Sequence, residues 1–219
     1  MKRIISILIS SILVITVLTV NVSAGDENDP EIQDGEGDII GTLVKYPGLF
    51  KILQSIGVIP IQSFEFMDVT SAWFYENQTE PDYLFVSIKI KDLGYTPLRA
   101  IYAVSWTYHE KHYGAACHTH SNGEFSWFVA GQTFGLFDNW AYKKGLIKDI
   151  SDCTIDIEKN IITLKIPKNI VGNPNPGDAL TETSAWTGLR FIREVFTIPL
   201  GGEMAKDPTS YGSEYLIQY

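Results

Sequence analysis

The fold of this chain is decided by residues 84–91, which read Leu84-Phe85-Val86-Ser87-Ile88-Lys89-Ile90-Lys91. Every second residue from Leu84 to Ile90 is aliphatic, so these side chains share one face of an extended strand. Ser87 and Lys89 lie between them and suit the opposite face. This period of two predicts a strand with one face buried in a core.

Segments of the same kind recur along the chain and are separated by turn formers. We expect strands within 64–75, 100–109, 113–120, 124–134, 153–158, 161–166, 181–186, 189–198 and 215–219. Lys159-Asn160 suits a hairpin turn, and Asn173-Pro174-Asn175-Pro176-Gly177-Asp178 is a cluster of turn residues. Many short strands with at most one short N-terminal helix predict a mostly β fold. We expect an antiparallel β-sandwich of the jelly-roll or immunoglobulin-like type over 62–219.

Residues 1–24 have the features of a secretory signal. Lys2 and Arg3 form a basic start, and the 17 residues of 4–20 are almost wholly apolar. Val22-Ser23-Ala24 is a small-residue pattern that predicts cleavage after Ala24. The alternative is an uncleaved anchor, because the run reaches the lower limit of the roughly 17–25 residues that span a bilayer. We expect a secreted or cell-surface protein without a stable membrane span after cleavage.

Two segments separate the signal from the predicted sandwich. Residues 25–38 contain seven acids, three Gly and no base, which predicts a flexible acidic leader. Residues 39–61 place apolar residues at helical spacing between Pro47 and Gly57. This pattern predicts a short helical or irregular element that packs on the core.

The charge of the chain excludes one class of partner. Asp and Glu total 26 against 17 Lys and Arg, which gives a net charge of −9 at pH 7. Loss of Lys2 and Arg3 leaves 15 basic residues and a net charge of −11. Nucleic-acid binding needs a basic surface, so we expect no nucleic-acid partner. Hydrophobic residues at 45% suffice for a buried core and exclude wholesale disorder.

Two cysteines and one sequon bear on covalent modification. In an oxidising compartment Cys117 and Cys153 predict one intramolecular disulfide, with two free core thiols as the alternative. Asn77-Gln78-Thr79 matches the N-glycosylation sequon in a loop-like context and predicts glycosylation at Asn77.

Two parts of the chain resemble known β-sandwich families. The first is Asp68-Val69-Thr70-Ser71-Ala72-Trp73-Phe74, a polar loop and then residues 83–90; it is similar to the opening hairpin of DOMON-type and family 9 carbohydrate-binding-module domains. The second is Ile162-Thr163-Leu164-Lys165-Ile166-Pro167, followed by Gly172 and Gly177-Asp178; it is similar to their late strand running into a turn. Together these parts cover about half of the mature chain. The resemblance implies a secreted β-sandwich that binds sugar or, less often, haem. The Met and His ligands of haem-binding members have no counterpart here.

All histidines of the chain lie close together, at positions 109, 112, 118 and 120. With Glu110-Lys111 as a two-residue turn, His109 lies opposite His112, and Ala103 lies opposite His118. The histidines then share one face, and the other face carries as core Tyr102, Val104, Trp106, Tyr108, Tyr113 and Cys117. His112 and His118 would be roughly 20 Å apart along the strand, which excludes a single site of four histidines.

A second hairpin turn is predicted at Asn122-Gly123. It places Phe125 opposite His120 and Trp127 opposite His118. The candidate ligand surface of Trp127, Phe125, His118 and His120 combines aromatic rings with hydrogen-bonding nitrogens, which suits the apolar faces and hydroxyl rims of sugars. His118 and His120 are also candidate ligands of Zn²⁺ or Cu²⁺, given a third ligand from a neighbouring strand. A purely structural role is the remaining alternative.

Two acids are candidates for a structural calcium site. Asp178 follows Pro176-Gly177 and Asp207 precedes Pro208, so either could ligate Ca²⁺, with ordinary turn roles as the alternative. The sequence contains no nucleophile elbow, zinc helix or phosphate loop, so no catalytic residues are assigned and we expect no enzymatic activity.

These observations predict a secreted, non-catalytic binding module for carbohydrate or glycoconjugate at the cell exterior. The first alternative is a metal-binding surface protein that uses His118 and His120. The second is a structural module of a surface layer or extracellular filament, which self-associates through its edge strands. Calcium, zinc and copper are the candidate cofactors.

Overall fold

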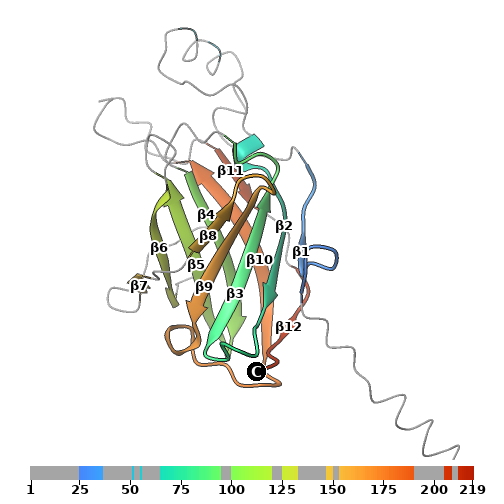
Figure 1. Cartoon of the computed structure of the whole chain (residues 1–219), viewed down its shortest axis with the longest axis vertical. Helices are drawn as coiled ribbons and strands as arrows, with labels where there is room; N and C mark the ends of the chain where they lie inside the picture. The colour runs from blue at the N-terminus through green and yellow to red at the C-terminus, as the bar shows by residue number, and fades with distance from the viewer. Residues whose placement is uncertain are drawn as a thin grey trace, which may run out of the picture.

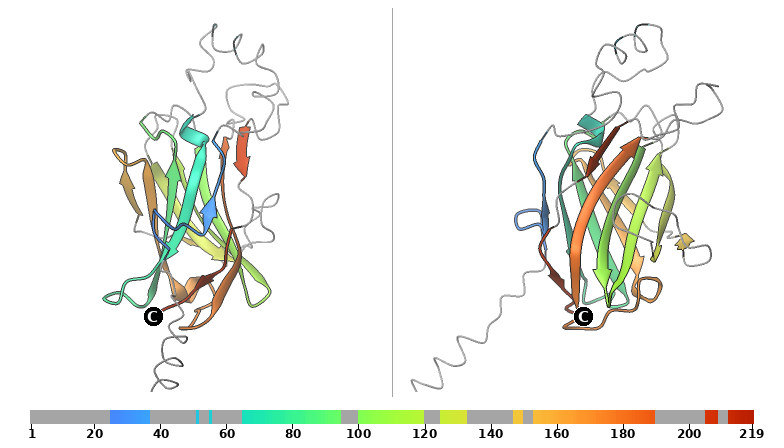
Figure 2. Two further views of the ribbon diagram at one scale, coloured as in Figure 1. Left: turned by 90° about the vertical axis from the view of Figure 1, so that its right-hand side faces the viewer. Right: turned by 180° about the vertical axis from the view of Figure 1, so that it is seen from behind.

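The computed structural model describes residues 25–36, 51, 55, 65–94, 100–119, 125–132, 147–149, 153–189, 205–208 and 212–219. Over these residues two antiparallel sheets face each other (Figures 1 and 2). The five-stranded sheet has the order β1 (Ile32–Gln33), β2 (Val69–Tyr75), β3 (Tyr83–Ile90), β9 (Ile161–Pro167) and β8 (Cys153–Asp156). The seven-stranded sheet has the order β11 (Ala205–Pro208), β10 (Ala179–Leu189), β4 (Ala100–Tyr108), β5 (Lys111–Thr119), β6 (Phe125–Gln132) and β7 (Ile147–Asp149), and β12 (Tyr215–Leu216) pairs with the start of β10. The predicted class, an antiparallel β-sandwich, is confirmed.

The core lies between the two sheets and follows the period of two in the strands. In β3 the alternate residues Leu84, Val86, Ile88 and Ile90 are at most 1% exposed, as the sequence predicts. The predicted core face of β4 and β5 is also buried; it comprises Tyr102, Val104, Trp106, Tyr108, Tyr113 and Cys117. Two short 3-10 helices, η1 (Glu65–Met67) and η2 (Lys168–Ile170), lie at opposite ends of the sandwich (Figure 1).

The hairpin between β4 and β5 turns at His109 and Glu110, where Tyr108 pairs with Lys111. The predicted turn at Glu110-Lys111 is therefore wrong, and the register differs by two residues along β5. Two residues are one full side-chain period, so the faces are unchanged and the predicted core face is still right. His109 and Glu110 have φ of 47° and 58°, as a primed two-residue turn requires. The His109 ring stacks on Tyr108, which supports this turn without glycine.

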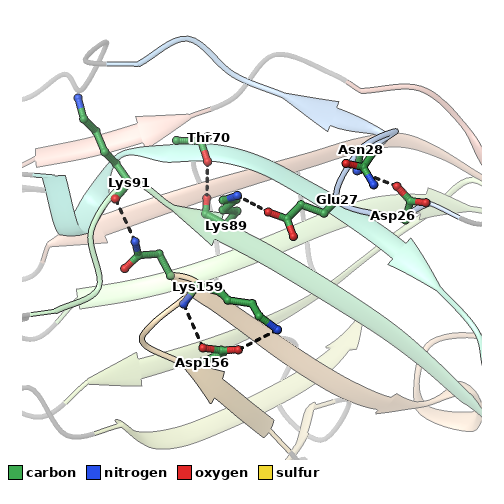
Figure 3. A network of polar contacts seen from close by, with 9 residues as sticks. Asp26, Glu27, Asn28, Thr70, Lys89, Lys91, Asp156 and Lys159 are labelled. Atoms are coloured by element: carbon green, nitrogen blue, oxygen red, sulfur yellow. Dashed lines mark hydrogen bonds and ion pairs between the residues drawn. The ribbon is translucent and has the colours of Figure 1, made fainter.

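The acidic segment 25–36 lies against the sandwich, whereas the sequence predicted a flexible leader over 25–38. Ile32 is fully buried, and β1 pairs with β2 through Ile32–Ala72 and Gln33–Ser71. Two acids of the segment meet lysines at the end of β3: Glu27 pairs with Lys89, and Glu36 lies 3.1 Å from the Lys91 ammonium (Figure 3 shows the first pair). The prediction failed because the partners of these acids lie more than fifty residues away in the sequence.

The structure contains Cys117 and Cys153 as free thiols, so the predicted disulfide is wrong here. Cys117 lies on β5 and Cys153 on β8, which belong to facing sheets. Cys117 is part of the core cluster, and Cys153 packs against that cluster. Burial raises the pKa of the Cys117 thiol and raises that of Cys153 to about 12. The two cysteines therefore match the alternative prediction of two free core thiols.

The predicted signal, residues 1–24, lies outside the described residues. Of the predicted helical element 39–61, only Lys51 and Ser55 are described, and both are helical. Within the described part of the chain, no helix has the length and apolar character needed to cross a bilayer.

Candidate binding site

The predicted histidine surface is described in part. His118 on β5 is half-buried and pairs in register with Trp127 on β6, as predicted. The register then shifts, so that Phe125 pairs with Thr119 and not with His120. His120 and the side chains of Phe125 and Trp127 lie outside the described residues. The predicted ligand surface therefore stays a prediction.

His112 belongs to a hydrogen-bonded chain across three strands on the outer side of the seven-stranded sheet. Thr107 donates its hydroxyl hydrogen to Glu182 Oε2 at 2.7 Å. The Thr107 oxygen also lies 2.9 Å from His112 Nδ1. Because the single hydroxyl hydrogen is used on Glu182, Nδ1 of His112 must donate, and the neutral ring carries its lone pair on Nε2. Glu182 has φ of 50° at a break in the β10–β4 register, which turns its side chain toward Thr107.

The described side chains do not form a metal site. No group of three His, Cys, Asp or Glu side chains among them has the required arrangement. The carboxylate of Asp178 accepts hydrogen bonds from the Asn175 backbone N–H and the Tyr108 hydroxyl, both at 2.7 Å. The bond from the Asn175 backbone, and then the bond from Tyr108, lower the pKa of Asp178. These contacts within the loop fit the turn role that the sequence analysis gave as the alternative to calcium binding. Asp207 lies in β11, and its side chain is outside the described residues.

A groove of about 620 Å³ lies at the end of the sandwich where η2 and the C-terminal segment meet (lower end of Figure 1). Its lining combines three asparagines, two tyrosines, four prolines and two charged residues: Asn169, Asn173, Asn175, Tyr83, Tyr219, Pro81, Pro167, Pro174, Pro176, Asp82 and Lys168. Three segments distant in sequence supply them, namely residues 81–83, residues 167–176 and Tyr219. The groove is thus a product of the tertiary fold.

The loop from η2 to β10 is held in one conformation by its own backbone. The Asn173 N–H donates to the Lys168 carbonyl at 2.8 Å, and the Asp178 N–H donates to the Asn175 carbonyl at 3.0 Å. Gly177 and Asp178 exchange further backbone bonds with Ile217. Prolines in the same loop restrict φ. The side chains that line the groove are therefore held on a rigid frame.

Gly172 of this loop is required by its backbone and its surroundings. Its φ is +93°, and a Cβ there would lie 2.8 Å from Tyr108 Cδ1 and from the Tyr113 hydroxyl. We expect Gly172→Ala to lower the free energy of unfolding by about 2 kcal/mol, measured by urea denaturation, because backbone strain and a clash add. Gly177→Ala is the matched control, since Gly177 has φ of +89° and no atom within 4 Å of its added Cβ. Equal losses in the two variants would contradict the steric part.

Aromatic residues continue from the groove along the outer face of the five-stranded sheet. Lys165 lies over the Tyr83 ring, 4.3 Å from its centroid, and also pairs with Glu80. Further along, the rings of Tyr75 and Phe85 stack with centroids 5.0 Å apart. The sequence contained a signal for this face. Tyr83 and Phe85 alternate with the core residues of β3, so two aromatic side chains lie on the outer face at the start of the strand.

The groove itself was missed by sequence reasoning, which assigned its asparagine–proline run only to a turn. The predicted glycosylation residue Asn77 is exposed in the loop between β2 and β3, and Thr79 donates to its side-chain oxygen at 2.9 Å. Glycosylation there stays a prediction. Comparisons with family models, curated proteins and solved structures found no match to this chain. The resemblance to DOMON-type and family 9 carbohydrate-binding-module domains therefore also stays a prediction.

Proposed function

We propose that the protein is a secreted, non-catalytic carbohydrate-binding module and that its ligand site is the groove. The observation that carries this proposal is the presence of side-chain amides beside tyrosine rings in one groove on a rigid loop. Amides donate and accept hydrogen bonds to sugar hydroxyls, and aromatic rings pack on the apolar CH faces of a sugar ring. Asn169 and Asn173 are exposed, and their amides have no hydrogen-bond partner within the described residues.

The charges around the groove favour a neutral ligand. The ammonium group of Lys168 is 2.5 Å from Glu76, so this cation of the described lining is already neutralised. Asp82 adds a carboxylate, and the whole chain carries a net charge of −9. Like charges disfavour an anionic polysaccharide. The proposed ligand class is therefore a neutral oligosaccharide or glycoconjugate.

The tyrosine at the edge of the groove can be tested without disturbing its backbone. The Tyr219 ring is exposed, while its backbone N–H donates to Glu76 and its backbone oxygen accepts from Lys168. We expect Tyr219→Ala to weaken binding of a neutral oligosaccharide about tenfold, because one aromatic contact contributes roughly 1–1.5 kcal/mol. Glycan-array screening of residues 25–219 finds the ligand, and isothermal titration measures the affinity. Asn173→Gly, which keeps the φ of 55°, should weaken binding about threefold to tenfold.

The matched control is Ile157→Ala. Ile157 is a 57% exposed apolar side chain in the hairpin between β8 and β9, at the opposite end of the sandwich. Its removal should leave binding unchanged. Unchanged affinity in both groove variants would contradict the groove as the binding site. If Trp127→Ala then lost oligosaccharide binding, the binding site would lie on the β5–β6 surface. Failure to bind any neutral glycan would contradict the function. Stoichiometric zinc or copper, lost in His118→Ala, would support the metal-binding alternative.

A further inference from the structure

Glu31 carries a carboxylate in an unusual place for an acid. The residue is 9% exposed and lies between the start of β1 and the edge of β2. Its Oε2 atom accepts a hydrogen bond from the Phe74 backbone N–H at 2.9 Å. Within the described residues no Lys, Arg or His forms an ion pair with it, and Asp26 and Asp29 of its own segment add negative charge. Burial, followed by these charges, raises the pKa of Glu31 to about 7. A positive charge at this position would therefore find a ready partner.

Gly25 packs directly on this carboxylate. Gly25 is buried, and a Cβ built on it would lie 2.3 Å from both Oε1 and Oε2 of Glu31. Its Cα is one bond of about 1.5 Å further away, so it lies within about 4 Å of both oxygens. The backbone nitrogen of Gly25 is one bond from that Cα. Gly25 is also the residue that follows Val22-Ser23-Ala24, where the sequence predicts cleavage.

We propose that cleavage after Ala24 creates a buried ion pair between the new α-ammonium group of Gly25 and the carboxylate of Glu31, and that this pair locks the N-terminal segment onto the sandwich. In the cleavage step a signal peptidase adds water across the Ala24–Gly25 peptide bond. Ala24 leaves with the carboxylate, and Gly25 keeps the amine, which takes up a proton at neutral pH. The inference rests on the secretion part of the proposed function and is independent of the ligand.

The position of Glu31 gives this ion pair an effect on three segments. The Glu31 carbonyl accepts from the Ser213 N–H at 2.8 Å, and Gly212 donates to the Thr183 carbonyl at 2.7 Å. The C-terminal segment approaches so closely that a Cβ on Gly212 would lie 2.2 Å from the Glu31 carbonyl oxygen. Glu31 therefore joins the N-terminus, β2 and the segment before β12. Fixing its side chain stabilises all three together.

The pH dependence of stability distinguishes the two forms. Without the amine, the folded-state pKa of Glu31 is about 7, above its usual value of 4.5, so the folded chain holds a proton that the unfolded chain releases. Stability of the uncleaved form then falls as pH rises from about 4.5 to 7. The other groups facing Glu31 are Asp26 and Asp29 beside it and Tyr215 from β12, and they are present in both forms. In the cleaved form the α-ammonium group of Gly25 favours the ionised carboxylate of Glu31, so this loss of stability with rising pH should disappear.

The test compares the chain that begins at Gly25 with one that begins at Ala24, both made by removing a fusion partner in vitro. At pH 7 we expect the added Ala24 to lower Tm by roughly 6 °C or more, as loss of a buried pair predicts. In the Glu31→Gln background the two chains should differ by less than about 2 °C. Glu27→Gln is the control, because Glu27 is exposed in the same segment and pairs with Lys89, and it should preserve the full difference.

Carbamylation with cyanate gives a second measurement that needs no variant. The α-amine of the folded chain should react at least tenfold more slowly than that of the urea-unfolded chain. Equal Tm values for the two chains, or an equal drop in the Glu31→Gln background, would overturn the ion pair. A freely reactive amine would overturn it as well. N-terminal sequencing of the secreted protein tests the cleavage position separately, and a start other than Gly25 would overturn the maturation step.

Discussion

Glu76→Gln is expected to lower the free energy of unfolding by about 3–5 kcal/mol, because it breaks a buried ion pair from one side. The Glu76 side chain is fully buried, and that of Lys168, 2.5 Å away, is 5% exposed. The same carboxylate accepts hydrogen bonds from the Tyr215 hydroxyl at 3.2 Å and the Gln218 N–H at 2.5 Å. An amide would remove the countercharge that Glu76 supplies to Lys168 and would direct N–H groups at donors. Guanidinium denaturation measures the loss.

The stability lost in Glu76→Gln should arise because the ion pair with Lys168 is buried, and two further variants test this. Glu80→Gln is the control, because Glu80 pairs with Lys165 in a half-exposed setting and should cost less than about 1 kcal/mol. The double variant Glu76→Gln/Lys168→Gln should lose less than the sum of the two single losses, since it leaves no unpaired charge. A loss below about 1 kcal/mol in Glu76→Gln alone would show that the pair does not hold the C-terminal segment.

Strand periodicity accounts for the part of the fold that the sequence could predict. The alternation in 84–91 places four aliphatic residues of β3 in the core. The predicted hairpin from β8 to β9 is present, but Asp156 pairs with Ile161, so its turn covers residues 157–160 and not Lys159-Asn160 alone. The core face of β4 and β5 was predicted from a wrong turn. It was nevertheless right, because burial of a face depends on the parity of the register and not on its absolute position.

The features that escaped prediction depend on partners distant in the sequence. The turn at His109 and Glu110 could not be predicted from residue type. Both residues have positive φ, and the turns that need two positive φ values usually contain asparagine and glycine. The acidic composition of 25–36 suggested a solvated leader, and only the tertiary fold brings Lys89 and Lys91 to it. The groove likewise depends on three segments that meet at one end of the sandwich.

Trp106→Ala is expected to cost about 3–5 kcal/mol, because Trp106 joins the two sheets at the centre of the core. The residue is fully buried on β4, and its ring meets Phe74 of β2 edge to face with centroids 5.6 Å apart. It also stacks on Tyr113 of β5. Truncation would leave a cavity bordered by both rings, which rigid strands cannot close. Thermal and denaturant unfolding measure the loss.

Trp106→Phe separates the packing of this side chain from its polar atom. Within the described residues, the indole Nε1 of Trp106 is buried and has no hydrogen-bond acceptor. A buried donor without a partner is destabilising by about 1–3 kcal/mol, so deleting it offsets part of the lost volume. We therefore expect Trp106→Phe to cost less than half as much as Trp106→Ala, while the aromatic contact with Phe74 is kept. Equal losses would mean that Nε1 has an acceptor in solution, and that Trp106 stabilises the sandwich through a polar bond as well as through contact between the sheets.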